Sequence, residues 1–319
     1  MTGRNSLYGP LHDVAGDAGY SPEHPSRVGF FTDTSVCIGC KACEVACKEW
    51  NLLPDDGFDL LGMSMDNTGN LGNSSWRHVA FIEQERPTSP AAAEVTAAAV
   101  ATATDLGMPS FALPGDGSRA DGRGASEGLS DFRWLMASDV CKHCTHAACL
   151  DVCPTGALFR TEFGTVVVQS DICNGCGYCV SACPYGVVER REGDGRAWKC
   201  TMCYDRLGAG LEPACAKACP TDSIQFGVLD ELREKAHARV EVLHSRGVSE
   251  ARLYGADPGD GVGGDGAFFL LLDEPEVYGL PPDPVVTTRD LPDIYGYAVA
   301  AAGAMLAAAI AVFAGGRRS

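Results

Sequence analysis

Sixteen cysteines dominate the sequence, and their spacing restricts the fold more than any other feature. They form four groups, and in the first and third groups the gaps are two, two and three residues. The middle gap widens to four residues in the second group and to eleven in the fourth. Such self-similarity indicates repeated structural units. The groups are Cys37, Cys40, Cys43 and Cys47; Cys141, Cys144, Cys149 and Cys153; Cys173, Cys176, Cys179 and Cys183; and Cys200, Cys203, Cys215 and Cys219.

Cysteines at this density serve either disulfides or metal ligation. A disulfide scaffold requires an oxidising compartment, and two cysteines separated by only two residues rarely pair with each other. The first twenty residues contain neither an apolar segment nor a twin-arginine pair, so we expect no export signal there. The sequence therefore favours metal ligation.

The triple C-x2-C-x2-C runs favour iron–sulfur clusters over zinc. Structural zinc sites use two pairs of ligands, a pattern that leaves the additional cysteines of these runs unexplained. In two-cluster ferredoxins the fourth cysteine, usually followed by proline, ligates the other cluster. Pro154, Pro184 and Pro220 follow the fourth cysteines of three groups, whereas Lys48 follows Cys47. At four thiolates per cubane, the sixteen cysteines predict four [4Fe–4S] clusters.

Complete thiolate ligation leaves no open iron position, so the predicted chemistry is one-electron transfer. His143 and His146 lie inside the second group, which already has four cysteines, and we expect both outside the ligand set. Four lysines adjoin cysteines, and their charge could raise local reduction potentials or serve only solubility and packing: Lys41, Lys48, Lys142 and Lys199.

The rest of the sequence carries no signature of a substrate-activating centre. The net charge of −17 repels phosphate backbones and excludes nucleic acid as a partner. The G-x-G-x-x-G pattern at residues 261–266 precedes a predicted strand instead of opening a helix, which indicates a loop. No nucleophile elbow, H-E-x-x-H pair or P-loop is present, so we expect no catalysis by this chain alone.

Local patterns predict the remaining elements. Residues 77–84 and 267–272 read as strands, and residues 87–130 are rich in Ala, Gly, Ser and Pro. We interpret residues 87–130 as a surface insertion, with a partner-docking arm as the alternative. Apolar residues at three- and four-residue steps then predict one amphipathic helix that ends before Gly247: Leu229, Leu232, Ala236, Val240 and Leu243.

Residues 294–316 contain no charge and are long enough to cross a bilayer as one helix. Tyr295 and Tyr297 lie at one end, and Arg317 and Arg318 follow the other, as interface anchors do. We expect a single-pass, membrane-associated chain; the alternative is an alanine-rich helix buried against a partner subunit. The two arginines favour a cytoplasmic C-terminus, but alone they leave the membrane face open.

With these motifs the chain resembles the four-cluster iron–sulfur subunits of molybdenum and tungsten oxidoreductases. Within that family it is similar to the beta subunits of membrane-bound formate dehydrogenases. The resemblance is carried by residues 34–51, 77–84, 173–179, 199–207 and 212–221, and by residues 278–284 before the single apolar helix. It implies an α+β fold of two bacterial-ferredoxin-like modules with insertions. Residues 87–130 depart from the family pattern without touching a cysteine.

The resemblance also implies ligand sets that cross between the groups. The four implied sets are Cys37, Cys40, Cys43 with Cys219; Cys47 with Cys200, Cys203, Cys215; Cys141, Cys144, Cys149 with Cys183; and Cys153 with Cys173, Cys176, Cys179. The implied domains are an N-terminal extension (1–30), a first module (31–86 and 199–228), the insertion (87–130), a second module (131–198), a connector (229–293) and the apolar helix (294–316).

By the same resemblance, a molybdenum or tungsten bis-pterin alpha subunit would oxidise formate. Electrons would pass through this chain to a membrane cytochrome b or similar quinone-reactive gamma subunit. Three alternatives stay open: the same electron path serving a sulfoxide, sulfur-compound or nitrate reductase; a soluble ferredoxin-like carrier, which the apolar helix disfavours; and a non-redox metal-binding scaffold.

Overall fold

The computed structural model describes residues 4–5, 9–10, 26–57, 62, 65–66, 68–86, 131–286, 288 and 290–315. The predicted insertion at 87–130 therefore lies outside the described residues. Two compact units emerge, of which one comprises residues 81–135 and the other the remainder of the chain. Within the smaller unit, Phe81 packs edge-on against Trp134 with ring centroids 5.9 Å apart.

The larger unit is organised by a four-stranded sheet. Its strands are β3 (Val28–Asp33), β10 (Ile224–Val228), β11 (Arg252–Tyr254) and β12 (Ala267–Leu271), in the order β10-β3-β12-β11. β3 pairs antiparallel with β10 and parallel with β12, so segments far apart in sequence lie side by side. All five residues of β12 are buried, which explains their unbroken apolar sequence.

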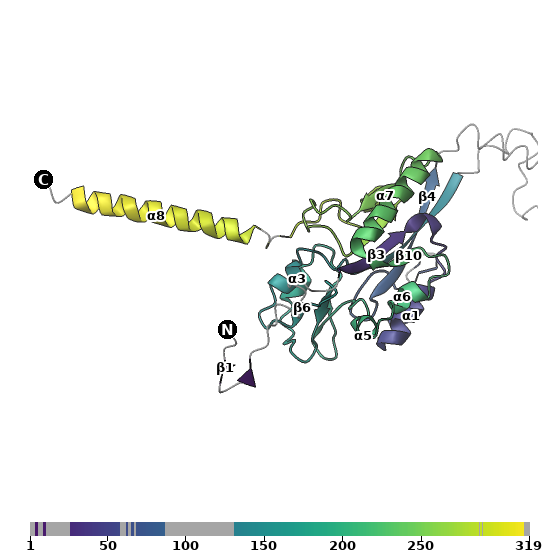
Figure 1. The fold of residues 1–319 in the computed structure, drawn as a ribbon, viewed down its shortest axis with the longest axis horizontal. Coiled ribbons are helices and arrows are strands. Elements are labelled where there is room, and N and C mark those ends of the chain that lie inside the picture. Colours follow the sequence, from purple (N-terminus) through teal and green to yellow (C-terminus); the bar gives the residue numbers. More distant parts are fainter. Residues whose placement is uncertain are drawn as a thin grey trace, which may run out of the picture. The chain divides into compact units, whose positions relative to one another are not determined.

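Helix α7 (Leu229–Ser245) packs against this sheet (Figure 1). Its buried Leu229, Leu232, Ala236 and Leu243 confirm the predicted amphipathic helix. Phe31 of β3 and Phe268 of β12 stack beneath the helix with ring centroids 5.3 Å apart. The sheet thereby gains an apolar core on one face.

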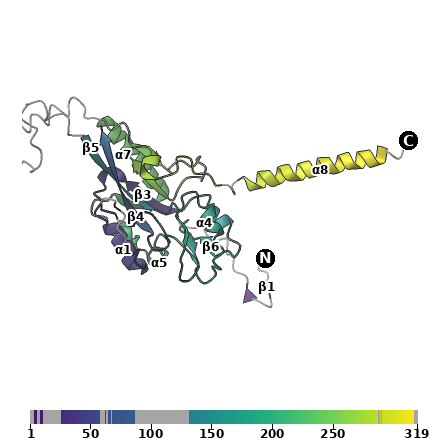
Figure 2. The ribbon, with the colours of Figure 1, turned by 180° about the vertical axis from the view of Figure 1, so that it is seen from behind.

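Short elements hold the cysteine loops. The helices are α1 (Ala42–Asn51), α3 (Ala148–Asp151), α4 (Tyr178–Ala182), α5 (Tyr204–Gly208) and α6 (Ala214–Lys217), with one-turn helices η2 (Thr34–Val36) and η3 (Pro275–Tyr278). Four two-stranded pairings are β1 (Arg4–Asn5) with β2 (Gly9–Pro10), β4 (Arg77–Arg86) with β5 (Asp131–Val140), β6 (Leu158–Arg160) with β7 (Val166–Val168), and β8 (Glu189–Arg190) with β9 (Ala197–Trp198). Figure 2 shows β4 and β5 as neighbours. The strand predicted at 77–84 thus extends to Arg86.

Helix α8 (Leu291–Gly315) completes the fold. Within it, Asp293–Phe313 is long and apolar enough to cross a membrane by length and composition, and none of that window is buried. The single apolar C-terminal helix predicted from the sequence is therefore present.

Candidate iron–sulfur sites

The four cysteine groups share one local conformation. The third cysteine of each group is the second residue of a short helix: Cys43 in α1, Cys149 in α3, Cys179 in α4 and Cys215 in α6. The residue before each second cysteine adopts a left-handed conformation, with φ between 47° and 72°: Gly39, His143, Gly175 and Met202. Glycine meets this requirement without strain, whereas His143 and Met202 must be held there by burial.

Quartet A consists of Cys37, Cys40, Cys43 and Cys219, which line one cavity of about 290 Å³. Strand pairing explains how residues so far apart meet. β3 runs toward Cys37 and β10 begins shortly after Cys219, and Asp33 N donates to Ser223 O at 2.8 Å. The Ser223 hydroxyl donates back to Asp33 O, also at 2.8 Å. The crossing between the first and fourth groups thus follows from the antiparallel β3–β10 pair.

Quartet B consists of Cys47, Cys200, Cys203 and Cys215, all of which are buried. Packing of α1 against α6 brings Cys47 to the fourth group, and burial together with Cys200 and Cys215 raises the pKa of Cys47 well above its usual value. Asn51 Nδ2 lies 3.7 Å from Cys47 Sγ and 3.9 Å from Cys203 Sγ. One amide therefore faces sulfurs from two different groups.

Quartet C consists of Cys141, Cys144, Cys149 and Cys183, which line a second cavity of about 350 Å³. The contact between α3 and α4 brings the second and third groups together. The Gly261–Gly266 segment, predicted as a loop, forms one and packs on this group. There, Thr145 N donates to Gly264 O at 3.0 Å and His146 N donates to Val262 O at 2.8 Å.

Quartet D consists of Cys153, Cys173, Cys176 and Cys179. Burial raises the pKa of Cys179 to about 11, and the neighbouring Cys173, Cys153 and Cys176 add to that rise. Ala197 N donates to Cys173 Sγ at 3.4 Å, and Cys176 is exposed. The structure therefore brings together all four cysteine sets that the resemblance implies.

The thiol chemistry of these sites fits a bound cation-rich cluster. Burial raises the pKa of Cys43 to about 11 and that of Cys149 to about 12, so bound iron must supply the positive charge that stabilises their thiolates. Within the described ranges, no three Cys, His, Asp or Glu side chains converge as they would around a single metal ion. A cubane instead takes one thiolate at each of its irons, around a wider volume.

Neither histidine of the second group belongs to a cysteine set. His143 is buried, and its Nδ1 accepts from Val166 N at 3.0 Å, which leaves the proton on Nε2. Burial first, and then nearby cations including Lys199, lower the pKa of His143 well below its usual value. Nε2 lies at the quartet C residues without a partner among the described residues, as a donor to an anionic ligand would. His146 is exposed.

The quartets follow one another in series, because cysteines of neighbouring quartets affect each other's ionisation. Cys43 of quartet A is influenced by Cys215 of B, and Cys200 of B by Cys141 of C. Cys149 of C is influenced by Cys179 of D. The spatial order is therefore A-B-C-D, and exposed cysteines occur only in the two end quartets, at Cys40 and Cys176.

Sequence reasoning missed one charged residue at these sites. Arg77, at the start of β4, is 2% exposed and donates through Nη1 to Ser138 O and Oγ, both at 3.2 Å. Burial lowers its pKa, but Cys215, Cys43, Cys200 and Cys47 raise it more, so the net direction is upward. A charged residue opening an otherwise apolar strand was the available signal.

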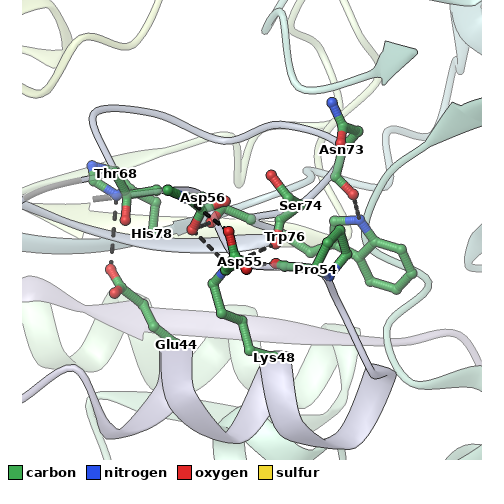
Figure 3. Close-up of polar contacts among 12 residues, drawn as sticks. Glu44, Lys48, Pro54, Asp55, Asp56, Thr68, Asn73, Ser74, Trp76 and His78 are labelled. Atoms are coloured by element: carbon green, nitrogen blue, oxygen red, sulfur yellow. Dashed lines mark hydrogen bonds and ion pairs between the residues drawn. The ribbon is translucent and has the colours of Figure 1, made fainter. Parts of the chain in front are cut away.

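A polar network fixes α1 beside quartets A and B (Figure 3). Lys48 projects from α1 to pair with Asp56 at 2.5 Å, and its Nζ donates to Pro54 O and Ser74 O. One turn earlier, Glu44 accepts from Val79 N and lies 3.7 Å from His78 Nδ1. Opposite charges on one helix thus hold the following loop and β4 in place.

Comparison with known proteins identifies the class first. Two family models, each described as a 4Fe-4S dicluster domain, match residues 36–157 and 132–229. The chain is therefore an iron–sulfur protein with two ferredoxin-like dicluster domains, which give four [4Fe–4S] clusters.

Its curated relatives narrow this class. The chain is 36% identical over 270 residues to the nitrate-inducible formate dehydrogenase iron-sulfur subunit of Escherichia coli, covering 83% of this chain and 76% of that protein. Identity is also 36%, over 269 residues, to the formate dehydrogenase iron-sulfur subunit of Haemophilus influenzae, covering 83% and 72%. It is 32% over 211 residues to the B subunit of the E. coli anaerobic dimethyl sulfoxide reductase, covering 66% and 78%. The chain belongs to the family of formate dehydrogenase iron–sulfur subunits.

Proposed function

We propose that this chain carries electrons from a formate-oxidising catalytic subunit with a molybdenum or tungsten bis-pterin site toward a quinone-reactive membrane subunit. When bound, each cluster supplies reversible one-electron transfer. The observation that carries the proposal is the continuous series of quartets from A to D. Complete cysteine ligation at every quartet leaves this chain without a substrate-activating centre, so the chemistry belongs to its partners.

The two ends of the series suit contact with partners. Ile38, beside Cys40 of quartet A, is 58% exposed. Tyr178 and Ile172, beside Cys176 of quartet D, are 60% and 43% exposed. Exposed apolar side chains next to an accessible cysteine favour protein docking there, while the buried quartet B is shielded from solvent. We assign the catalytic and membrane subunits to these two ends.

The crossed quartets are the proposed ligand sets, and they define two modules. Quartets A and B join residues 31–86 to 199–228, and quartets C and D lie within 131–198. The cavities at quartets A and C, together with the β3–β10 pairing, support this assignment.

Matched serine replacements test the ligand sets. Cys219→Ser should perturb the same electron paramagnetic resonance signal as Cys40→Ser, and Cys47→Ser the same signal as Cys203→Ser. If Cys219→Ser instead perturbs the signal affected by Cys203→Ser, the crossing is wrong. The full complex is used, since its activity shows whether assembly survives each replacement.

We further propose that α8 spans the membrane once. Its apolar window is fully exposed in the described structure, and Tyr295 and Tyr297 lie near its N-terminal end. A bilayer or a membrane subunit would cover that surface.

Anaerobic purification of the tagged chain from its own membranes tests the partners. We expect about four irons per cluster, a large partner that contains molybdenum or tungsten, and formate-dependent dye reduction. Zinc in place of iron would support a non-redox scaffold and refute electron transfer.

A sulfoxide reductase is the second candidate, because the B subunit of a dimethyl sulfoxide reductase shares 32% identity with this chain. The same purified complex discriminates the two. Sulfoxide-dependent oxidation of a reduced dye, without formate activity, would reverse the assigned direction of electron flow and keep the ligand sets.

A further inference from the structure

Lys199 places a buried cation between quartets B and C. Its side chain is fully enclosed, with the residue 1% exposed, and Nζ lies 3.6 Å from Cys141 Sγ of quartet C. The same Nζ donates to Cys200 O of quartet B at 3.0 Å and to Val166 O. Burial lowers the pKa of Lys199, but Cys141, Cys149 and Cys200 raise it more, so the ammonium form is favoured.

Arg77 occupies the equivalent position between quartets A and B. Its guanidinium faces Cys43 of quartet A and Cys47, Cys200 and Cys215 of quartet B. Nη1 is held by Ser138, while Nε and Nη2 are buried without partners among the described residues. Phe30 covers the guanidinium from the sheet side, with its ring centroid 4.8 Å from Cζ. These donors therefore point to an acceptor that protein groups do not supply.

The other lysines beside ligands have carboxylate partners. Lys48 pairs with Asp56 and is partly exposed, and Lys41 pairs with Glu44 and Asp66. Lys142 is buried but pairs with Asp139 and lies over the Phe269 ring at 4.8 Å. The structure thus separates Lys199 from the lysines that neighbour cysteines only in sequence.

We propose that Arg77 and Lys199 are shared tuning residues, each of which raises the reduction potentials of the two clusters it lies between. A cubane held by four thiolates is anionic and gains a further negative charge on reduction. A permanent cation nearby favours the reduced form, and burial protects this effect from solvent screening. Quartet B feels both cations, quartets A and C feel one each, and quartet D feels neither. The inference rests on the proposed ligand sets.

Redox titration of the purified holo-complex, followed by electron paramagnetic resonance, tests this pattern without assigning individual signals. Lys199→Gln should lower two of the four one-electron midpoints, and Arg77→Gln should also lower two. The double variant should lower three, with one midpoint shifting by roughly the sum. We expect at least a tenfold loss in the equilibrium constant for reduction of each affected cluster, or about 59 mV.

Matched variants separate charge from structure. Lys199→Arg and Arg77→Lys keep the cation and should keep all four midpoints near those of the wild type. Lys48→Gln removes a lysine adjacent to Cys47 whose charge faces Asp56, and should shift none. Lys199→Met is the second neutral variant, because a flexible apolar side chain can fill the buried path if Gln impairs cluster loading.

Two results would overturn the inference: unchanged midpoints in iron-replete neutral variants, or equal shifts of all four midpoints in either single variant. Shifts in Lys199→Arg as large as those in Lys199→Gln would also overturn it, because charge would not be the cause. A wild-type protein with fewer than four one-electron steps would instead refute the proposed ligand sets.

Discussion

Replacing Phe31 with alanine should loosen the sheet that positions quartet A. Phe31 is 1% exposed and stacks on Phe268 at 5.3 Å, and β3 pairs with β10 and β12 on either side. Removing a buried phenylalanine side chain costs about 3–5 kcal/mol, part of which is the aromatic pair itself. At about 4 kcal/mol the unfolded fraction rises roughly a thousandfold, a large share of the about 5–15 kcal/mol that stabilises a typical domain.

The effect should reach the cysteines because β3 leads to Cys37 and β10 follows Cys219. Anaerobic urea unfolding of the iron-loaded protein measures it, with circular dichroism for the fold and visible absorption for the clusters. Phe31→Ala should lower both midpoints together. Phe31→Leu should recover most of the loss, since it restores most of the apolar volume.

Leu52→Ala is the matched control, because Leu52 is 88% exposed and its truncation removes little buried surface. A Phe31→Ala midpoint equal to that of Leu52→Ala would refute the reasoning, since a residue of the proposed core would then contribute no more than a surface residue. A lower cluster midpoint with an unchanged circular dichroism midpoint would show that Phe31 acts locally at quartet A.

Three further predictions follow from other contacts. Burial raises the pKa of Asp56, but hydrogen bonds from Lys48 and neighbouring serines lower it more, so the net pKa lies below its usual value. Its carboxylate should therefore stabilise the fold above about pH 4 and lose that effect as the pH falls further; Asp56→Asn should cost about 1 kcal/mol at pH 7 and almost nothing at pH 3, measured by unfolding after a rapid pH jump. Gly29→Ala places a Cβ 2.2 Å from a backbone carbonyl oxygen and should cost about 1–3 kcal/mol in thermal unfolding, whereas at Gly227 the nearest atom is 3.9 Å away and alanine should be tolerated much better. A chain truncated before Leu291, produced without its partner subunits, should keep its iron content and leave the membrane fraction; continued membrane association would contradict anchoring by α8.

The sequence predicted features that depend on local pattern. Cysteine spacing indicated the dicluster domains, and the three- and four-residue apolar steps predicted the helix that runs from Leu229 to Ser245. The apolar run at residues 267–272 predicted β12, which is buried on both faces. Each of these signals lies within a few turns of chain, where periodicity and spacing are informative.

Features that depend on tertiary contact were not predictable in this way. Ile224 lies opposite Thr32 in the β3–β10 pair, and no local pattern indicates that register. Arg77 has the sequence appearance of an ordinary solvated charge, and only packing by Phe30 and Ser138 makes it a buried cation. Lys199 could be noticed beside Cys200, but its contact with Cys141 depends on how two cysteine groups meet.

The proposed crossing of ligands also explains why a long insertion can be accommodated between cysteine groups. Cys37 and Cys219 are 182 positions apart (219 − 37), and residues 87–130 contribute 44 of them. Because closure entropy of an unfolded chain grows only with the logarithm of its length, those 44 residues add roughly 0.2 kcal/mol to the cost of joining the two cysteines. The structural demand falls instead on the ends of β4 and β5 nearest quartet A, where Arg77 and Ser138 are hydrogen-bonded across the pair. That pairing keeps the cysteine loops in register whatever the length of chain beyond it, so shortening the insertion should matter far less than breaking the Arg77–Ser138 contact.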